Sequence, residues 1–197
     1  MLTEIRTALR PALVLLFLLA AITGLAYPTL VAGIAQVTMP HQANGSLIVD
    51  SGRITGSELI GQSFAAPRYF HPRPSAAGKG YDASASAATN LAPGSRDLRD
   101  AIAKRVAEAR ADGLTGRTVP PDLVTTSASG LDPDLSPEAA LSQVPRVARA
   151  RNMDPGQLRV LIASNIQYPL LGIIGEPHVN VLKLNRQLDR TPIHPAP

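Results

Sequence analysis

The side chains that could perform chemistry in this chain are few, and histidine is the first type to consider because it binds zinc and transfers protons. The sequence contains four histidines and no cysteine. Zinc sites usually place two ligands four residues apart on a helix, or close together in a short loop. The histidines do not follow that spacing, so we expect no metal site. Surface or capping roles are predicted for His41, His71, His178 and His194.

Two further segments imitate ligand-binding motifs. Asp132 and Asp134 are two residues apart, as the first ligands of a calcium-binding loop are, but the further ligands and the closing Glu are missing. Lys79 lies between glycines, but the first Gly and the final Ser/Thr of a phosphate-binding loop are absent. We expect turn and helix-cap roles for the aspartates, no phosphate site at the lysine, and no cofactor of the chain's own.

Serine nucleophiles are the remaining possibility for catalysis. Ser127 and Ser129 lie in the sequence TTSASG, which lacks the G-x-S-x-G pattern of a nucleophile held between a strand and a helix. Small polar packing explains both serines, and no catalytic residue is predicted. Residue types and spacing alone favour a domain without an active site. A membrane-anchored or secreted binding domain, or a hydrolase, stays open as the alternative.

One apolar segment near the amino terminus determines where the rest of the chain lies. Thirty consecutive residues between Arg10 and His41 include no Asp, Glu, Lys, Arg or His, and about 20 apolar residues suffice to cross a bilayer. A cleaved signal peptide is the alternative, because a basic start, an apolar core and a small-x-small site before Tyr27 are present. The apolar run continues past Pro28, longer than a signal peptide needs, so we favour a retained transmembrane helix over residues 11–37.

Small residues in this helix are candidates for packing against another helix, because association in lipid depends on close van der Waals contact. Lipid-facing positions without a partner are the alternative. Pro28 is expected to kink the helix, since it lacks an N–H and its ring crowds the preceding turn. The predicted packing residues are Ala20, Gly24, Ala32 and Gly33.

The charges at the helix ends predict its orientation. Arg6 and Arg10 precede the apolar run, whereas the first basic residue after it is Arg53. Cytoplasmic flanks contain the Lys/Arg excess. Residues 1–10 are therefore expected in the cytoplasm, and residues 38–197 on the periplasmic or extracellular side of the cell (inner) membrane. That outer part contains 17 Lys/Arg and 14 Asp/Glu without a basic run, so nucleic-acid binding has no support.

The outer part is predicted to be one α+β domain. Leu47–Val49 and Ile54 are expected to form a hairpin around a D-S-G turn. Leu59–Phe64 is expected to be a strand or a turn. Ala66–Asn90, rich in Pro, Gly, Ser and Ala, is expected to be a long ordered loop, with disorder as the alternative.

Four helices are predicted to follow, each begun by a residue that can cap the first turn. Their expected limits are Ser95 to Asp112–Gly113, Ser136 to an interruption at Pro145, Asp154 to Pro169, and Asn180 to Leu188. Apolar residues at helical spacing define the inward faces of three of them. These faces are Leu98, Ile102, Val106 and Ala109; Leu158, Leu161 and Ile162; and Val181, Leu184 and Leu188.

Three runs of sequence resemble one known family. VPPDLVTTSASGLDPDLSPEAALSQVPRVARARNMDPGQL, residues 119–158, closely resembles the signature of the C subunit of the Kdp-type potassium-transporting ATPase, and residues 61–95 and 175–189 resemble that family in the same order. The resemblance covers nearly the whole chain. One departure is the sequence SAATNL at Ser86–Leu91, where many members have SGGSNL.

This resemblance implies an accessory, non-catalytic subunit of a high-affinity, ATP-driven potassium uptake pump. The implied partners are a channel-like potassium-binding subunit, a P-type ATPase subunit, a small one-helix subunit, and membrane lipid. ATP and K⁺ belong to the complex as a whole. The absence of a D-K-T-G phosphorylation motif and of a selectivity-filter sequence agrees with an accessory role.

The resemblance also implies one site residue. The family's C subunit is described as a catalytic chaperone that raises the ATP affinity of the ATPase subunit, with a glutamine as the nucleotide contact, and Gln143 is the matching residue. The predicted orientation places Gln143 outside the cytoplasm, away from ATP. An alternative is that Gln143 bonds carbonyls freed where Pro145 interrupts the helix.

Overall fold

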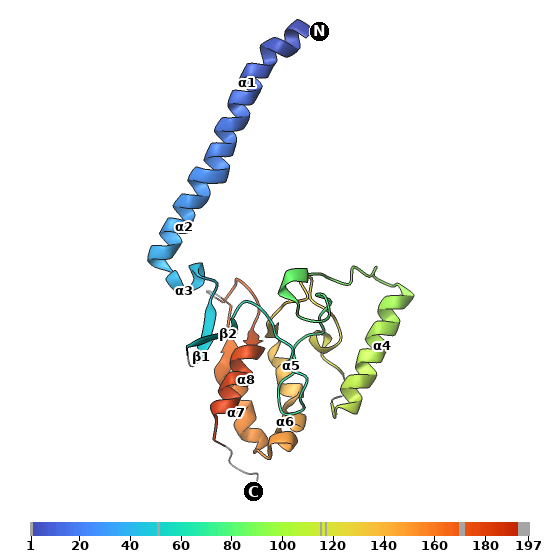
Figure 1. Cartoon of the computed structure of the whole chain (residues 1–197). Helices are drawn as coiled ribbons and strands as arrows, with labels where there is room; N and C mark the ends of the chain where they lie inside the picture. Colours follow the sequence, from blue (N-terminus) through green and yellow to red (C-terminus); the bar gives the residue numbers. More distant parts are fainter. Residues whose placement is uncertain (1, 51, 115, 117, 170–171, 193–197) are drawn as a thin grey trace. The chain divides into compact units, whose positions relative to one another are not determined.

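The computed structural model describes residues 2–50, 52–114, 116, 118–169 and 172–192 (Figure 1). The chain divides into two compact units, one ending at Leu47 and the other beginning at Ile48. The first unit is almost entirely one long helix, and the second mixes helices with short strands (Figure 1).

The long helix consists of α1 (Leu2–Ala21), a π-helical turn η1 (Ile22–Ala26) and α2 (Tyr27–Thr38). Its stretch from Arg6 to Thr38 is the one helix among the described residues that is long and apolar enough to cross a membrane, and none of that stretch is buried within the chain. The fold of this chain therefore leaves the apolar surface of the helix uncovered.

The π turn accommodates the proline that was predicted to kink the helix. The N–H of Tyr27 donates to the carbonyl of Ile22, five residues back. The next residue, Pro28, has no N–H to donate, and in a regular helix its ring would crowd the carbonyl of Gly24. We attribute the extra residue of the π turn to this crowding, and helical structure continues through the proline to Thr38.

A short helix α3 (Pro40–Ala43) ends the first unit, and the predicted hairpin follows with β1 (Leu47–Asp50) and β2 (Arg53–Ser57). Ser51 of its D-S-G turn lies outside the described residues. The next segment, Leu59–Phe64, begins with a turn and contains no strand. The long loop predicted at residues 66–90 is confirmed, with one short 3₁₀ turn η2 (Ala83–Ala85) inside it.

The first predicted helix of the second unit is α4 (Arg96–Ala111), and the Ser95 side chain accepts the N–H of Leu98 as its cap at 3.2 Å. Its predicted inward face is only half-buried: none of the residues of α4, all of which the structure describes, is fully buried. The 3₁₀ turn η3 (Pro121–Leu123) follows.

The interruption predicted at Pro145 divides one helical region into two. Ser136 caps α5 (Pro137–Ser142), and Pro145 lies in the first turn of α6 (Val144–Arg151), where a missing N–H does no harm. The third helix α7 (Pro155–Asn165) is capped by Asp154 as predicted. The prediction that α7 continues to Pro169 is wrong, because the next residues form a strand.

That strand, β4 (Ile166–Gln167), belongs to a small antiparallel sheet with β3 (Asp134–Leu135) and β5 (His178–Asn180) in the order β3-β5-β4. Pairing of Ile166 with Val179 fixes the register between β4 and β5. Asn180 then caps the last helix, α8 (Val181–Arg190), two residues longer than predicted.

The hydrophobic core of the second unit lies among α5, α6, α7, α8 and the three-stranded sheet (Figure 1). The predicted inward residues of α7 and α8 are all within it. Phe70, from the long loop, is fully buried in the same cluster. The cluster comprises Phe70, Leu135, Ala139, Ala140, Val144, Val147, Ala148, Met153, Leu158, Leu161, Ile162, Val179, Val181, Leu184 and Leu188.

Candidate functional site

Two buried side-chain amides hold one segment of the long loop, residues 66–72, which we call the strap. The Asn185 amide accepts the N–H of Phe70 and donates to the carbonyl of Phe70, both at 2.9 Å. The Gln143 amide does the same for the next residue, accepting the N–H of His71 at 2.8 Å and donating to its carbonyl at 3.0 Å. Each amide thus satisfies the donor and acceptor of one backbone residue, as a neighbouring strand would.

The hydrogen-bonding capacity of Gln143 is fully used in this arrangement. Its oxygen also accepts from Arg146 Nη2 at 2.6 Å, and its nitrogen also donates to the carbonyl of Ala139 at 3.4 Å. With two bonds at the oxygen and two at the nitrogen, no donor or acceptor position of the amide remains open. A ligand could bond to Gln143 only by replacing one of these four bonds.

Arg146 extends the same network along the strap. Its Nη1 donates to the carbonyls of Pro67 at 2.6 Å and Tyr69 at 2.9 Å, so three neutral oxygens, counting that of Gln143, surround the guanidinium. The residue is 8% exposed, and burial lowers the pKa of its guanidinium. Arginine nevertheless stays charged because its ordinary pKa is so high.

A second arginine holds the outer edge of the strap. Arg151 donates from Nε to the carbonyl of Arg68 at 2.7 Å and pairs with Asp189 at 2.6 Å. Tyr69 donates its hydroxyl to the other oxygen of Asp189 at 3.0 Å. The guanidinium groups of Arg68 and Arg151 lie 4.9 and 5.0 Å from the centre of the Tyr69 ring, a cation–π arrangement.

A hollow of about 230 Å³ lies beside the strap, between it and α4. Gln143 and Arg146 line it from one side, with His71. Burial, and then the nearby Arg146 charge, lower the pKa of His71, so this imidazole is neutral at pH 7. The other lining residues are Pro72, Pro74, Arg105, Glu108, Ala109, Asp112, Leu114 and Leu123. Charges of both signs meet here, and the geometry offers a neutral imidazole and polar rim but no nucleophile paired with a base.

Hydrogen bonds hold the segment TTSASGLDP, residues 125–133, against the long loop, and we call this contact the clasp. Ser75 Oγ donates to the carbonyl of Gly130 at 2.6 Å, and the N–H of Ala87 donates to the carbonyl of Ser129 at 3.0 Å. Gly130 has φ of 66°, and a Cβ there would lie 2.6 Å from the carbonyl oxygen of Ala87. Only glycine fits this crossing without displacing backbone.

The structure gives the two candidate serines packing and turn roles. Ser127 is buried at 7% exposure, and Ser129 Oγ accepts the N–H of Leu131 at 3.1 Å. In the nearby segment that departs from the family, Ser86, which is unchanged, donates its Oγ to the carbonyl of Ser129 at 2.9 Å. Ala87 and Ala88, where glycines are frequent in the family, do not need a left-handed backbone, whereas Asn90 does adopt one at φ 50°.

The two candidate aspartates lie close together and are held by different partners. Asp132 accepts the N–H of Asp134 at 3.0 Å and pairs with Arg73 at 3.1 Å. Asp134 lies 3.9 Å from His178, and burial raises the pKa of its carboxyl. Across the part of the chain that the structure describes, no three His, Asp or Glu side chains are grouped to hold a metal ion.

The other predicted positions are dispersed. His41 lies in α3, Lys79 is exposed in the long loop, and His194 lies outside the described residues.

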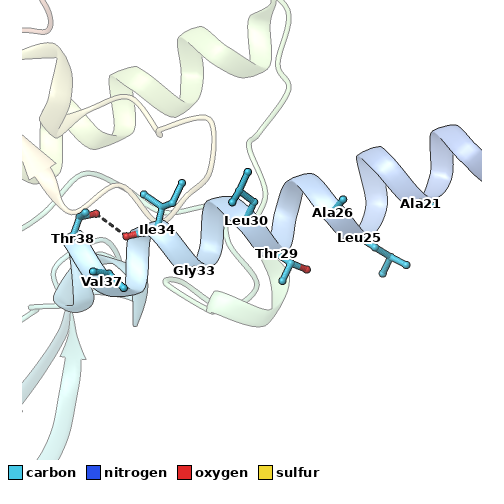
Figure 2. A pocket seen from close by; sticks show the side chains of 9 residues that line it. All are labelled: Ala21, Leu25, Ala26, Thr29, Leu30, Gly33, Ile34, Val37 and Thr38. Carbon is cyan, nitrogen blue, oxygen red and sulfur yellow. Dashed lines mark hydrogen bonds between the residues drawn. The ribbon is translucent and has the colours of Figure 1, made fainter.

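The predicted packing residues of the long helix are all exposed. A Cβ built on Gly24 or Gly33 would meet no atom within 4 Å, so these positions leave room for a close neighbour. Figure 2 shows the stretch around Gly33, where Leu30, Ile34 and Val37 line an open apolar surface along α2.

The model of one protein family, described as "KdpC: K+-transporting ATPase, c chain", matches residues 9–190. The chain belongs to the KdpC family. It is 54% identical over 182 residues to a potassium-transporting ATPase KdpC subunit of Caulobacter vibrioides (strain NA1000 / CB15N), covering 92% of each chain. It is 52% identical over 194 residues to that of Bradyrhizobium diazoefficiens, covering 92% of this chain and 96% of the other.

Sequence reasoning identified one residue of the strap network in this KdpC-family chain and missed the others. Gln143 was identified as a site residue through the resemblance to the family. Arg146 and Asn185 were unassigned, although a polar residue inside the apolar face of a helix, as Asn185 is between Leu184 and Leu188, signals a buried hydrogen-bonding role. The strap itself carries no periodic pattern, so no signal marked it as the partner.

Proposed function

We propose that this chain is the accessory subunit of an ATP-driven potassium uptake pump, and that it does not hydrolyse ATP itself. The observation that carries the proposal is the family match over residues 9–190, which includes both the apolar helix and the outer domain. Its partners are then a channel-like potassium-binding subunit, a P-type ATPase subunit and a small one-helix subunit. The alternative of an unrelated hydrolase or binding domain would have to explain that match.

The proposed topology is a single membrane span with the amino terminus in the cytoplasm and the second unit in the periplasm or outside the cell. The apolar stretch Arg6–Thr38 supports the span. The bias of Arg6 and Arg10 over the next basic residue, Arg53, supports the orientation.

The outer domain acts in this proposal as a rigid brace on the potassium-entry side of the pump. Its long loop lacks regular secondary structure. Hydrogen bonds from the amides of Gln143 and Asn185 and from the guanidinium groups of Arg146 and Arg151 fix it at the strap. The clasp at residues 125–133 fixes the same loop further along. Loops held this firmly on a packed scaffold are suited to binding a partner without a large entropic cost. The small residues of the helix would pack beside partner helices.

Gln143 is proposed to influence ATP affinity indirectly, by fixing the strap and hollow that face a partner. Direct contact with the nucleotide stays the alternative implied by the family. It would require Gln143 to exchange one of its four internal hydrogen bonds for a bond to ATP, and the cytoplasmic nucleotide to reach the outer domain.

Co-purification and ATPase measurements test this function. The full chain with an affinity tag, extracted from native membranes in mild detergent, should bring the other subunits with it. The assembled complex should hydrolyse ATP with stimulation by K⁺, while the chain alone should not. ATP hydrolysis by the purified chain, or stable purification without any partner under the same conditions, would contradict the proposal.

A further inference from the structure

The hairpin that joins β4 to β5 exposes large apolar side chains. Tyr168, just after β4, is 72% exposed, and Ile173 and Ile174, before β5, are 81% and 61% exposed. The same hairpin buries its base, where Val179 is fully covered. The fold therefore buries Val179 at the base of the hairpin, and it leaves Tyr168, Ile173 and Ile174 exposed.

The composition of this region matches a membrane interface. No charged residue occurs from Val160 to Gly175. Tyrosine is enriched where lipid head groups meet the acyl chains, and isolated branched aliphatic residues gain free energy by entering that zone. Exposed apolar side chains at one hairpin would favour aggregation of a soluble monomer, whereas on a membrane-tethered domain they have a surface to enter.

The tether keeps such a surface within reach. The apolar helix ends at Thr38 and the second unit begins at Ile48. Nine residues lie between them, so a fully extended connection spans at most about 30 Å. Four of the nine form α3 (Pro40–Ala43), which shortens it further. A domain on so short a tether stays at the membrane surface and can turn one edge toward the lipid.

We propose that Tyr168, Ile173 and Ile174 form a lipid-inserting tip that enters the interface of the outer leaflet. The inference rests on the proposed retention of the helix as a membrane anchor. With both the helix and the tip attached to the same leaflet, the outer domain would be held in one orientation relative to the membrane plane.

Tryptophan fluorescence tests the tip, because the chain contains no tryptophan of its own. Single-tryptophan variants of the full chain would be placed in liposomes made of phosphatidylcholine brominated in its acyl chains, which quenches tryptophan in contact with lipid. Ile174→Trp tests the tip, Leu25→Trp in the middle of the helix is the positive control, and Val160→Trp, an exposed position on α7, is the negative control.

We expect at least twofold quenching of Ile174→Trp and of Leu25→Trp by brominated lipid, and little quenching of Val160→Trp. An unquenched Ile174→Trp beside a quenched Leu25→Trp would overturn the tip and leave the anchor intact. An unquenched Leu25→Trp would instead refute the anchor. Blue-shifted emission of Ile174→Trp without bromine quenching would mean that protein rather than lipid covers the tip, which also overturns the inference.

Discussion

At the scale of single residues, the unusual feature is that two carboxamide side chains replace a neighbouring strand. The strap residues Phe70 and His71 lie in a buried region without a backbone partner, and a buried backbone group without a hydrogen bond costs free energy. Gln143, at the junction of α5 and α6, and Asn185 of α8 provide those bonds. A buried network of this kind is stabilising only when every member is satisfied.

Replacing Gln143 tests whether this role is structural. Gln143→Leu removes four hydrogen bonds and leaves the N–H and carbonyl of His71 without them. We expect the free energy of unfolding to fall by about 2–4 kcal/mol, measured by urea unfolding of the full chain in detergent, followed by tyrosine fluorescence. The control Gln167→Ala, at an exposed position, should change it by less than about 0.5 kcal/mol. A Gln143→Leu variant of unchanged stability that lowers the ATP affinity of the pump would instead favour direct nucleotide contact.

His71 predicts a pH dependence of stability. Burial and Arg146 lower its pKa in the folded chain below the ordinary value of 6.5, so the unfolded chain takes up the proton first. The stabilisation is complete above about pH 6.5 and is lost as the pH falls from there through the lowered pKa of the folded state. Urea midpoints of the full chain should therefore drop between pH 7.5 and 5.5, and the drop should be smaller in His71→Gln. An equal drop in both proteins would exclude His71 as its source.

At the scale of elements, local signals in the sequence were sufficient for most helices. Ser95, Ser136 and Asp154 cap the helices that they were predicted to begin, because a cap depends only on residues within one turn. The three-stranded sheet was missed, since strands of two or three residues show no alternation and their pairing joins β3 to a partner more than forty residues away. The same sheet explains why α7 ends at Asn165, before the proline that was expected to stop it.

The candidate site was less predictable than the helices for the same reason. The strap is irregular backbone whose partners come from α5, α6 and α8, and no local pattern links Arg146 or Asn185 to it. Resemblance pointed to Gln143, and only the three-dimensional arrangement shows that its partner is the backbone of His71.

The clasp between the long loop and residues 125–133 makes an element-scale prediction. Gly130→Ala forces a Cβ to within 2.6 Å of the Ala87 carbonyl at a positive φ, so we expect a loss of about 2–4 kcal/mol in the free energy of unfolding. Its neighbour Ser129→Ala loses one hydrogen bond to Leu131 and should cost about 1 kcal/mol. Thermal and urea unfolding of the two variants measures the difference. Equal losses would mean that the close crossing of the two loops does not hold this region.

At the scale of the whole molecule, the chain combines an apolar helix whose side chains are exposed with a domain that has its own hydrophobic core. The sequence predicted this division because the two parts differ so strongly in composition. The orientation stays a prediction from the charges of Arg6 and Arg10.

A cysteine introduced at one site tests the orientation. The chain has no cysteine, so Ser57→Cys in the outer domain gives a single thiol. On intact cells with a permeabilised outer envelope, a membrane-impermeant maleimide should label it before lysis. Thr7→Cys, before the apolar run, is the matched control and should react only after lysis. The opposite pattern would reverse the topology and make direct contact between Gln143 and cytoplasmic ATP plausible.

The most direct test of the account removes the outer domain and keeps the helix. A chain ending at Pro40, lacking residues 41–197, is produced with the other subunits, and the K⁺-stimulated ATPase activity of the purified complex is measured beside that of the complex with the full chain. If the outer domain has the proposed accessory role on the potassium-entry side, the truncated complex should lose this activity. Cells that contain it should fail to grow at limiting potassium. Full K⁺-stimulated hydrolysis and normal growth without residues 41–197 would contradict the account.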